Sequence, residues 1–205
     1  DLLNTRYILA YEPLFLPGLE RIMRGELKVY RNHDALPRAF LVDHVIVKPE
    51  EQEIFNLLRG PSFDPRRSVI FEQTPPAHEL VGQGNTAALR VGSESPGTVR
   101  ITRYEPNRVG LLVDARRPAY LVLSEINYPG WRVSVDGRRS AVRTANFAFR
   151  AVYVPAGRHR VAWEFSPWSF RLGAAISLAS ALGLLALLVF WRRSRYRAER
   201  LSANS

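Results

Sequence analysis

The 205-residue chain contains no cysteine, and this absence excludes several functions at once. Without cysteine there is no disulfide framework and no thiolate metal site. The four histidines lie far apart in the sequence without the spacing of metal ligands. No Ser/His/Asp framework is visible either. We therefore expect no catalytic residue, no metal ion and no cofactor in this chain.

Lysine is nearly absent too, because arginine outnumbers it 27 to 2. The formal net charge is +10. Half of this excess lies from Ser169 onward, where six arginines face one glutamate. The remaining basic residues are scattered, whereas nucleic-acid binding proteins cluster them on one face. The charge therefore predicts no nucleic-acid partner.

One glycine-rich segment, Gly82-Gln-Gly84-Asn-Thr-Ala87, has the spacing of a dinucleotide fingerprint. That fingerprint needs a preceding strand and a following helix within a βαβ unit. The residues after Ala87 favour a strand and not a helix. The segment therefore does not alter the expectation that no cofactor binds.

Charge is missing altogether from the twenty residues between Leu172 and Trp191. At about 1.5 Å of rise per residue, a helix of this length crosses a bilayer core of about 30 Å. A buried helix of a soluble domain is the alternative, but such helices are rarely this long and uncharged. Arginines crowd the C-terminal side of the run. Because positive charge stays on the cytoplasmic side, we expect a cytoplasmic C-terminus and an extracytoplasmic segment 1–168.

The chain opens at Asp1 with no initiator methionine, no basic n-region and no apolar h-region. An extracytoplasmic domain must nevertheless be exported by something that precedes it. We expect the chain to be the C-terminal piece of a longer protein, and cleavage of a signal peptide is the alternative.

The extracytoplasmic part shows a hydrophobic period of two. His159, Val161, Trp163 and Phe165 alternate with polar or small residues, and Phe147, Phe149, Ala151 and Tyr153 form a second such series. This period is typical of strands with one face toward a core. Turn signals separate the strands, at Pro106-Asn107, Pro129-Gly130, Asp136-Gly137 and Pro155-Ala156-Gly157.

The resulting prediction is a mainly β protein, with an antiparallel, jelly-roll-like β-sandwich and one transmembrane helix. Upstream of it we expect a hairpin of 19–23 with 26–30, one long strand over 38–47, and a short helix over 49–59. Trp163 is placed in the core by its alternation, or in an aromatic belt at the membrane by its position. The domains predicted are 1–87 (mixed strands and one helix), 88–168 (β-sandwich), 169–191 (transmembrane helix) and 192–205 (basic cytoplasmic tail).

Two stretches are more specific than this pattern. The first runs from Tyr120 through Tyr128-Pro-Gly-Trp131 to Asp136-Gly137, and the second from Asn146-Phe-Ala-Phe-Arg150 to Pro155-Ala-Gly-Arg-His159. In this order, and followed by a membrane span, they resemble the C-terminal end of the bacterial YfhO family of polytopic membrane proteins. Residues 2–9 and 30–40 resemble the region that follows that family's upstream helices.

The resemblance implies a function. Members of this family are similar to GT-C glycosyltransferases, in which a bundle of membrane helices uses a polyprenyl-phosphate sugar donor and the terminal ectodomain is a β-sandwich. The acidic catalytic residues of that class lie in loops between early helices, and no position here matches them. The resemblance therefore implies a non-catalytic extracytoplasmic domain and last membrane helix of such an enzyme. A glycan-binding or assembly module of the cell envelope, without transferase activity, is the alternative.

Five residues are candidates for glycan binding in this reading. Aromatic faces pair with the apolar face of a sugar ring, and polar side chains nearby bind its hydroxyls. Tyr128 and Trp131 alternatively pack the sandwich around a tight turn, and Arg150 alternatively forms a structural ion pair. The expected partners are the bilayer of the bacterial cytoplasmic membrane, the upstream helices of the parent protein, and a lipid-linked sugar or envelope glycan. The candidates are Asn127, Tyr128, Trp131, Arg132 and Arg150.

Overall fold

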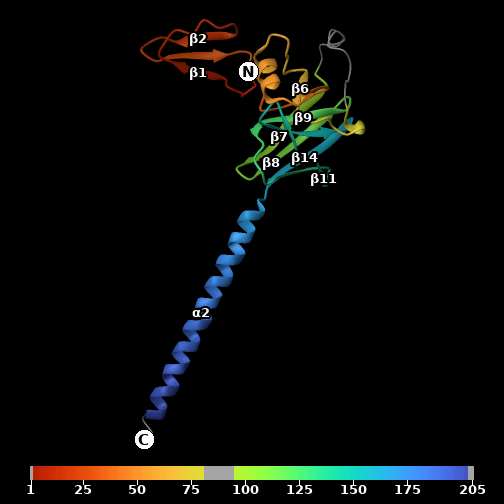
Figure 1. The fold of residues 1–205 in the computed structure, drawn as a ribbon. Coiled ribbons are helices and arrows are strands. Elements are labelled where there is room, and N and C mark those ends of the chain that lie inside the picture. Colours follow the sequence, from red (N-terminus) through yellow and green to blue (C-terminus); the bar gives the residue numbers. More distant parts are fainter. Residues whose placement is uncertain (1, 81–94, 203–205) are drawn as a thin grey trace. The chain divides into compact units, whose positions relative to one another are not determined.

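The computed structural model describes residues 2–80 and 95–202, and side chains as far as Trp191. The glycine-rich segment Gly82 to Ala87 lies outside the described residues. The chain divides into two units, Asp1–Phe165 and Ser166–Ser205. The first unit holds the strands and the second is a single long helix (Figure 1).

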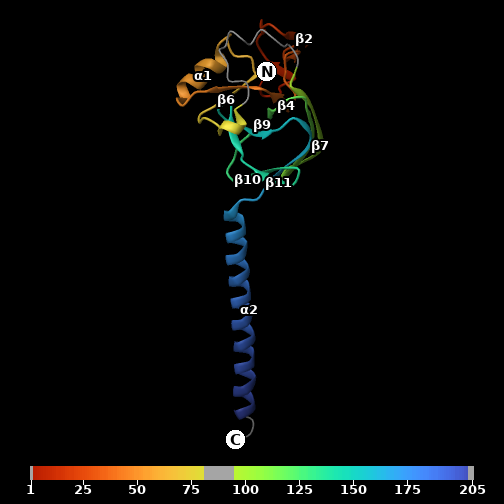
Figure 2. The same ribbon diagram turned by 90° about the vertical axis from the view of Figure 1, so that its right-hand side faces the viewer.

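Two antiparallel sheets form the centre of the first unit, as predicted (Figure 2). The five-stranded sheet has the order β11-β10-β14-β8-β7 and the four-stranded sheet the order β12-β13-β9-β4. The strands of the first sheet are β7 (Gly97–Glu105), β8 (Arg108–Ala115), β10 (Trp131–Val135), β11 (Arg138–Ser140) and β14 (Gly157–Phe165). Those of the second are β4 (Ala39–Val42), β9 (Ala119–Ile126), β12 (Arg143–Ala145) and β13 (Phe149–Val154).

Alternation along these strands builds the core between the sheets. In β14, Val161 and Trp163 are buried while Arg160, Ala162 and Glu164 are exposed, as the period of two predicts. The same cluster takes valines and leucines from β8 and β9. The β10–β11 hairpin turns at Asp136 and Gly137, whose φ angles of 52° and 77° are the positive pair of a type I′ turn.

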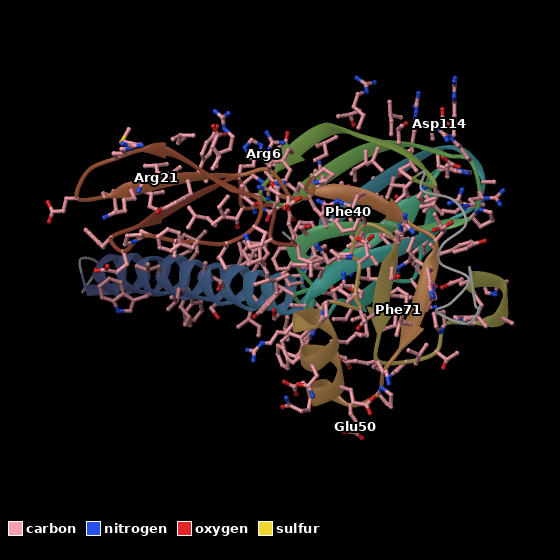
Figure 3. All side chains as sticks on the ribbon, turned by 90° about the horizontal axis from the view of Figure 1, so that it is seen from above. Arg6, Arg21, Phe40, Glu50, Phe71 and Asp114 are labelled. Atoms are coloured by element: carbon pink, nitrogen blue, oxygen red, sulfur yellow. The ribbon has the colours of Figure 1, made fainter. Side chains whose placement is uncertain are left out.

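The four-stranded sheet is covered on its second face as well. There a parallel pair, β5 (His44–Val47) and β6 (Ser68–Phe71), is joined by the helix α1 (Glu51–Arg59). Phe40 and Phe71, labelled in Figure 3, belong to the apolar cluster on this face. A short 3₁₀ helix, η1 (Ala77–Glu79), follows β6. The helix predicted over 49–59 is confirmed, with Glu51 and Glu53 in its first turn.

Two sequence expectations are wrong in detail: the single strand over 38–47 and the place of Phe147 in a strand. The single strand expected over 38–47 is two strands, because the chain leaves β9 after Val42 and pairs with β6 from His44 onward. Asp43 lies at the break and forms an ion pair with Arg117.

In β13, both faces are buried. Val152 and Val154 face the core between the sheets, on the same side of the strand as Arg150. Ala151 faces the outer cluster. Phe147, expected in the same series, lies before the strand with a φ of 77° and packs its ring 4.3 Å from that of Phe55. Period alone cannot tell the two faces apart when both are buried.

The N-terminal residues form a separate three-stranded sheet in the order β1-β3-β2. Its strands are β1 (Tyr7–Ala10), β2 (Leu19–Met23) and β3 (Lys28–Asn32), and β2 and β3 are the predicted antiparallel hairpin. Tyr30 is buried, and its hydroxyl accepts a hydrogen bond from the backbone of Leu14. Many large apolar side chains of this region are exposed: Tyr7, Leu9, Tyr11, Phe15, Leu16, Ile22 and Met23.

The second unit is the helix α2 (Trp168–Ser202). Within it, Trp168–Trp191 is long and apolar enough to cross a membrane, with a mean hydropathy of 2.3 over its most apolar window. At about 1.5 Å per residue, these 24 residues extend about 36 Å. The apolar helix predicted from the uncharged run is therefore confirmed.

Candidate functional site

Three aromatic side chains gather at one end of the five-stranded sheet. Trp131 begins β10 and is paired in register with Phe165, the last residue of β14. Their ring centroids are 5.3 Å apart, and the ring of Tyr128 lies 6.3 Å from that of Phe165. Tyr128 is 63% exposed, and its carbonyl accepts a hydrogen bond from the Trp131 backbone. We call Tyr128, Trp131 and Phe165 the aromatic cluster.

Arg150 lies directly beneath this cluster. The side chain is 1% exposed, and its guanidinium carbon lies 3.7 Å from the centroid of the Trp131 ring and 5.3 Å from that of Trp163. Its Nε and Nη1 atoms are buried without a hydrogen-bond partner. The negative faces of the two indole rings stabilise this cation in place of acceptors. One face of Trp131 is therefore occupied by the protein itself.

An irregularity in the sheet supplies the counter-ion. In the pairing of β13 with β9, Phe149 faces Ile126 but Arg150 faces Leu123, so Ser124 and Glu125 are extra residues on β9. Bulges of this kind redirect side chains. Glu125 Oε2 forms an ion pair with Arg150 Nη2. Burial lowers the pKa of Arg150 and the Glu125 carboxylate opposes that shift, so the guanidinium keeps its charge.

The other oxygen of Glu125 continues the network toward solvent. Oε1 accepts a hydrogen bond from the Tyr104 hydroxyl at 2.7 Å and lies 3.5 Å from Nη1 of Arg38. Arg38 also donates to the Tyr104 hydroxyl at 2.8 Å. Desolvation raises the pKa of Tyr104, and the hydrogen bond to Glu125 adds to the effect. We call Arg38, Tyr104, Glu125 and Arg150 the polar network.

A small pocket opens beside the polar network. It has a volume of about 180 Å³ and is lined by Tyr104, Glu105, Pro106 and Glu125. The turn that carries Pro106 is fixed to the aromatic cluster, because the backbone of Phe165 donates to the carbonyl of Asn107 at 2.9 Å. The pocket and the aromatic cluster therefore share one end of the sandwich.

The five sequence candidates fall into two groups. Tyr128, Trp131 and Arg150 meet through the aromatic cluster and its buried cation. Asn127 lies beside Tyr128, but its amide donates to Thr144 Oγ1 at 2.8 Å, which ties it to β12. Arg132 is exposed and lies next to Trp131 in β10, so its side chain points to the opposite face of the sheet.

Sequence reasoning missed the partners in the polar network. Glu125 ends the apolar strand Tyr120-Leu-Val-Leu-Ser-Glu125, where a carboxylate is unexpected, and that is the one signal that singles it out. Arg38 and Tyr104 lie 87 and 21 residues from Glu125. Only the pairing of β4 and β7 with their neighbouring strands brings them together. Tyr104 sits in an alternating strand like many others, so no local pattern marks it.

These features define a β-sandwich domain joined to one apolar helix that is able to cross a membrane. Comparison with protein families gives one match: the family described as "Bacterial membrane protein YfhO" over residues 90–177. The match covers β7 to β14 and the start of α2, and it confirms the resemblance to the C-terminal region of that family. The chain is accordingly a membrane protein. No curated protein and no solved structure matches the chain significantly.

Proposed function

We propose that the chain is the non-catalytic, extracytoplasmic C-terminal part, with the last membrane helix, of a GT-C-like glycosyltransferase of the bacterial cytoplasmic membrane. The parent enzyme would transfer a sugar from a polyprenyl-phosphate donor to a glycan of the cell envelope. The observation that carries the proposal is the exposed Tyr128 ring beside Phe165, three residues before α2 begins at Trp168.

The short chain segment between Phe165 and α2 connects this observation with the membrane. Three residues span at most about 10 Å. Phe165 is therefore held within that distance of the first residue of the apolar helix. The acceptor glycan must meet the lipid-linked donor in the same zone, because the prenyl chain of the donor stays in the bilayer. An aromatic cluster at this position is suited to hold a sugar residue by its apolar face.

In this proposal the domain contributes positioning and not bond chemistry. Holding a donor and an acceptor in a productive geometry lowers a barrier by removing their freedom of motion. Trp131 is restrained by Arg150 and Phe165, so it is rigid before any ligand arrives. Restraint of this kind reduces the entropy lost on binding. Arg150 then acts as a positioning residue and does not contact the glycan.

Two further features support the proposal: one concerns contact with the parent's membrane helices, and the other concerns the topology. Exposed tyrosine, leucine, phenylalanine and methionine side chains gather in the N-terminal sheet and its loops. Apolar surface on this scale is typical of sites that are covered in the assembled protein. The upstream membrane helices of the parent have the matching chemistry. The arginines after Trp191 support a cytoplasmic C-terminus.

The test measures sugar transfer by the full-length protein in membranes, with a polyprenyl-phosphate sugar as donor. Tyr128→Ala should raise the KM for the acceptor roughly two- to tenfold, as expected for one lost aromatic contact. Donor affinity should be unchanged. Arg138→Ala is the control, because Arg138 is exposed in β11 and pairs with Val135, at the opposite end of β10 from Trp131. Equal transfer by both variants and the wild type would contradict the proposed role.

The alternative module without transferase activity has a distinct outcome in the same assay. Membranes with the full-length wild-type protein would then bind envelope glycan in a Tyr128-dependent way and transfer no sugar. Transfer catalysed by the purified 205-residue chain alone would instead show that the chain itself is catalytic.

A further inference from the structure

We infer that the pocket lined by Tyr104, Glu105, Pro106 and Glu125 is a subsite for one uncharged sugar residue of the glycan. The inference deepens the proposed function and rests on it. The subsite is separate from the aromatic cluster, and none of the four lining residues is among the five sequence candidates for glycan binding. Its parts are two carboxylates, a phenol and an apolar proline ring around a space of about 180 Å³.

The carboxylate of Glu125 determines which groups of a ligand can bind in the pocket. Arg150 and Arg38 form ion pairs with this carboxylate, whose oxygens accept hydrogen bonds. Each carboxylate oxygen has two acceptor positions; Oε2 uses one for Arg150 and Oε1 uses one for the Tyr104 hydroxyl, which leaves one on each oxygen. The pocket therefore suits a ligand with two hydroxyl donors that are close enough to reach the two oxygens of one carboxylate. Vicinal hydroxyl groups of a sugar ring have that arrangement.

The remaining walls suit the ring itself. Tyr104 is 54% exposed, so part of its ring is available to the apolar face of a sugar. Pro106 adds a second apolar surface and no backbone donor. The volume lies below the roughly 300–1,000 Å³ of typical ligand pockets, so it holds a single small ring and not a whole oligosaccharide.

Charge argues for a neutral residue over an anionic one. The lining includes two glutamates and no arginine. Arg150 is buried beneath Trp131 and has no access to the pocket surface. A phosphate or uronate would find no cationic side chain in the lining, only carboxylate oxygens that accept hydrogen bonds and donate none. An amine is not required, because the polar network already neutralises Glu125.

The position of the pocket connects it with the aromatic cluster. The hydrogen bond from Phe165 to the carbonyl of Asn107 fixes the β7–β8 turn against the end of β14. A glycan chain can therefore place one residue in the pocket and a neighbouring residue on Tyr128. Glu125 joins the two places, since it lines the pocket and holds Arg150 under Trp131.

The test is saturation-transfer difference NMR on the full chain in detergent. The probes are methyl glycosides of glucose, galactose and N-acetylglucosamine, with methyl glucuronide and glucosamine as charged counterparts. At least one neutral glycoside should give a signal that Tyr104→Ala weakens fivefold or more. Tyr104→Phe keeps the ring and loses only the hydroxyl, so it should retain part of the signal. Tyr7→Ala is the matched control, because Tyr7 is 53% exposed and lies in β1.

Three results would overturn the subsite: no signal from any neutral glycoside, a signal unchanged in Tyr104→Ala, or tighter binding of the glucuronide or of glucosamine than of the neutral sugars. The unfolding transitions of the variants should match that of the wild type, which confirms that a lost signal reports the pocket. Failure here is distinguishable from failure of the proposed function. Transfer that depends on Tyr128 while the neutral glycosides do not bind removes the subsite and leaves the proposed function standing.

Discussion

The guanidinium of Arg150 is stacked on Trp131, with its central carbon 3.7 Å from the ring centroid, and this pair joins the core of the sandwich to its aromatic surface. A buried cation is stable only when its charge is balanced. Here the balance comes from Glu125 and from the faces of two tryptophans. Arg150 is therefore a structural residue, and it also restrains the Trp131 ring at the surface.

Removal of Arg150 should therefore destabilise the domain. Arg150→Ala leaves Glu125 without its buried partner and opens a cavity under Trp131, at a cost of about 3–5 kcal/mol in the free energy of unfolding. Denaturant unfolding followed by tryptophan fluorescence measures it. Arg132→Ala is the control, because Arg132 is exposed in the same sheet and should change stability by less than about 0.5 kcal/mol. Equal stability of the two variants would contradict the buried ion pair.

The sequence predicted the parts of this site that depend on local pattern. Period-two alternation predicted that Trp163 lies in a strand and faces the core, and the Asp-Gly dipeptide predicted a hairpin turn at Asp136-Gly137. The sequence also indicated that Tyr128 and Trp131 lie around a tight turn. What it could not predict is pairing between distant segments. β4 joins β9 across 77 intervening residues, from Val42 to Tyr120, and this pairing places Arg38 beside Glu125.

The irregular strand pairing at Glu125 could not be predicted from the sequence either. Alternation along β9 assigns each side chain to a face, and two extra residues in the pairing with β13 break that rule. The structural ion pair was one of the two alternatives for Arg150, but its complete burial could not be predicted, since arginine in a strand is usually exposed. Tertiary contacts decide both, and neither leaves a periodic signal in the sequence.

Trp163 allows a second test of the core. Its side chain is 0% exposed and belongs to the cluster between the two sheets, which favours the core over the membrane belt. Trp163→Ala should lower the free energy of unfolding by about 3–5 kcal/mol, because it leaves a large cavity. Thermal or denaturant unfolding measures the change. Trp168→Ala, at an exposed position in α2, serves as the comparison and should leave unfolding of the sandwich nearly unchanged. A loss below about 1 kcal/mol for Trp163→Ala would place that residue outside the core.

His44 predicts a dependence of stability on pH. It is 7% exposed, and neither ring nitrogen has a hydrogen-bond partner. Burial lowers its pKa, and the nearby Asp43 carboxylate only partly offsets this. The unfolded chain, with an ordinary histidine pKa of about 6.5, therefore takes up this proton more readily than the folded chain.

The sign follows from that difference. Stability should fall as pH drops below about 6.5, and the His44 contribution should level off once pH is below the lowered pKa of the folded state. His44→Leu keeps an apolar side chain at the site and should flatten this part of the profile. His33→Leu is the control, since His33 is exposed and paired with Glu20. Unfolding midpoints between pH 5 and 8 provide the measurement, and the same slope in His44→Leu as in the wild type would refute the assignment.

The proposed topology can be tested by thiol labelling, because these 205 residues contain no cysteine of their own. Ser62→Cys introduces a thiol at an exposed loop position after α1, and Ser194→Cys introduces one among the arginines that follow Trp191. An impermeant thiol reagent added to intact cells should label Cys at position 62 and not at position 194. After the cells are lysed, both should react. The physical reason is the retention of arginine on the cytoplasmic side, where the membrane potential and anionic lipids hold it. Labelling at position 194 in intact cells, with position 62 protected, would place the sandwich in the cytoplasm, where a polyprenyl-linked donor facing outward could not reach it.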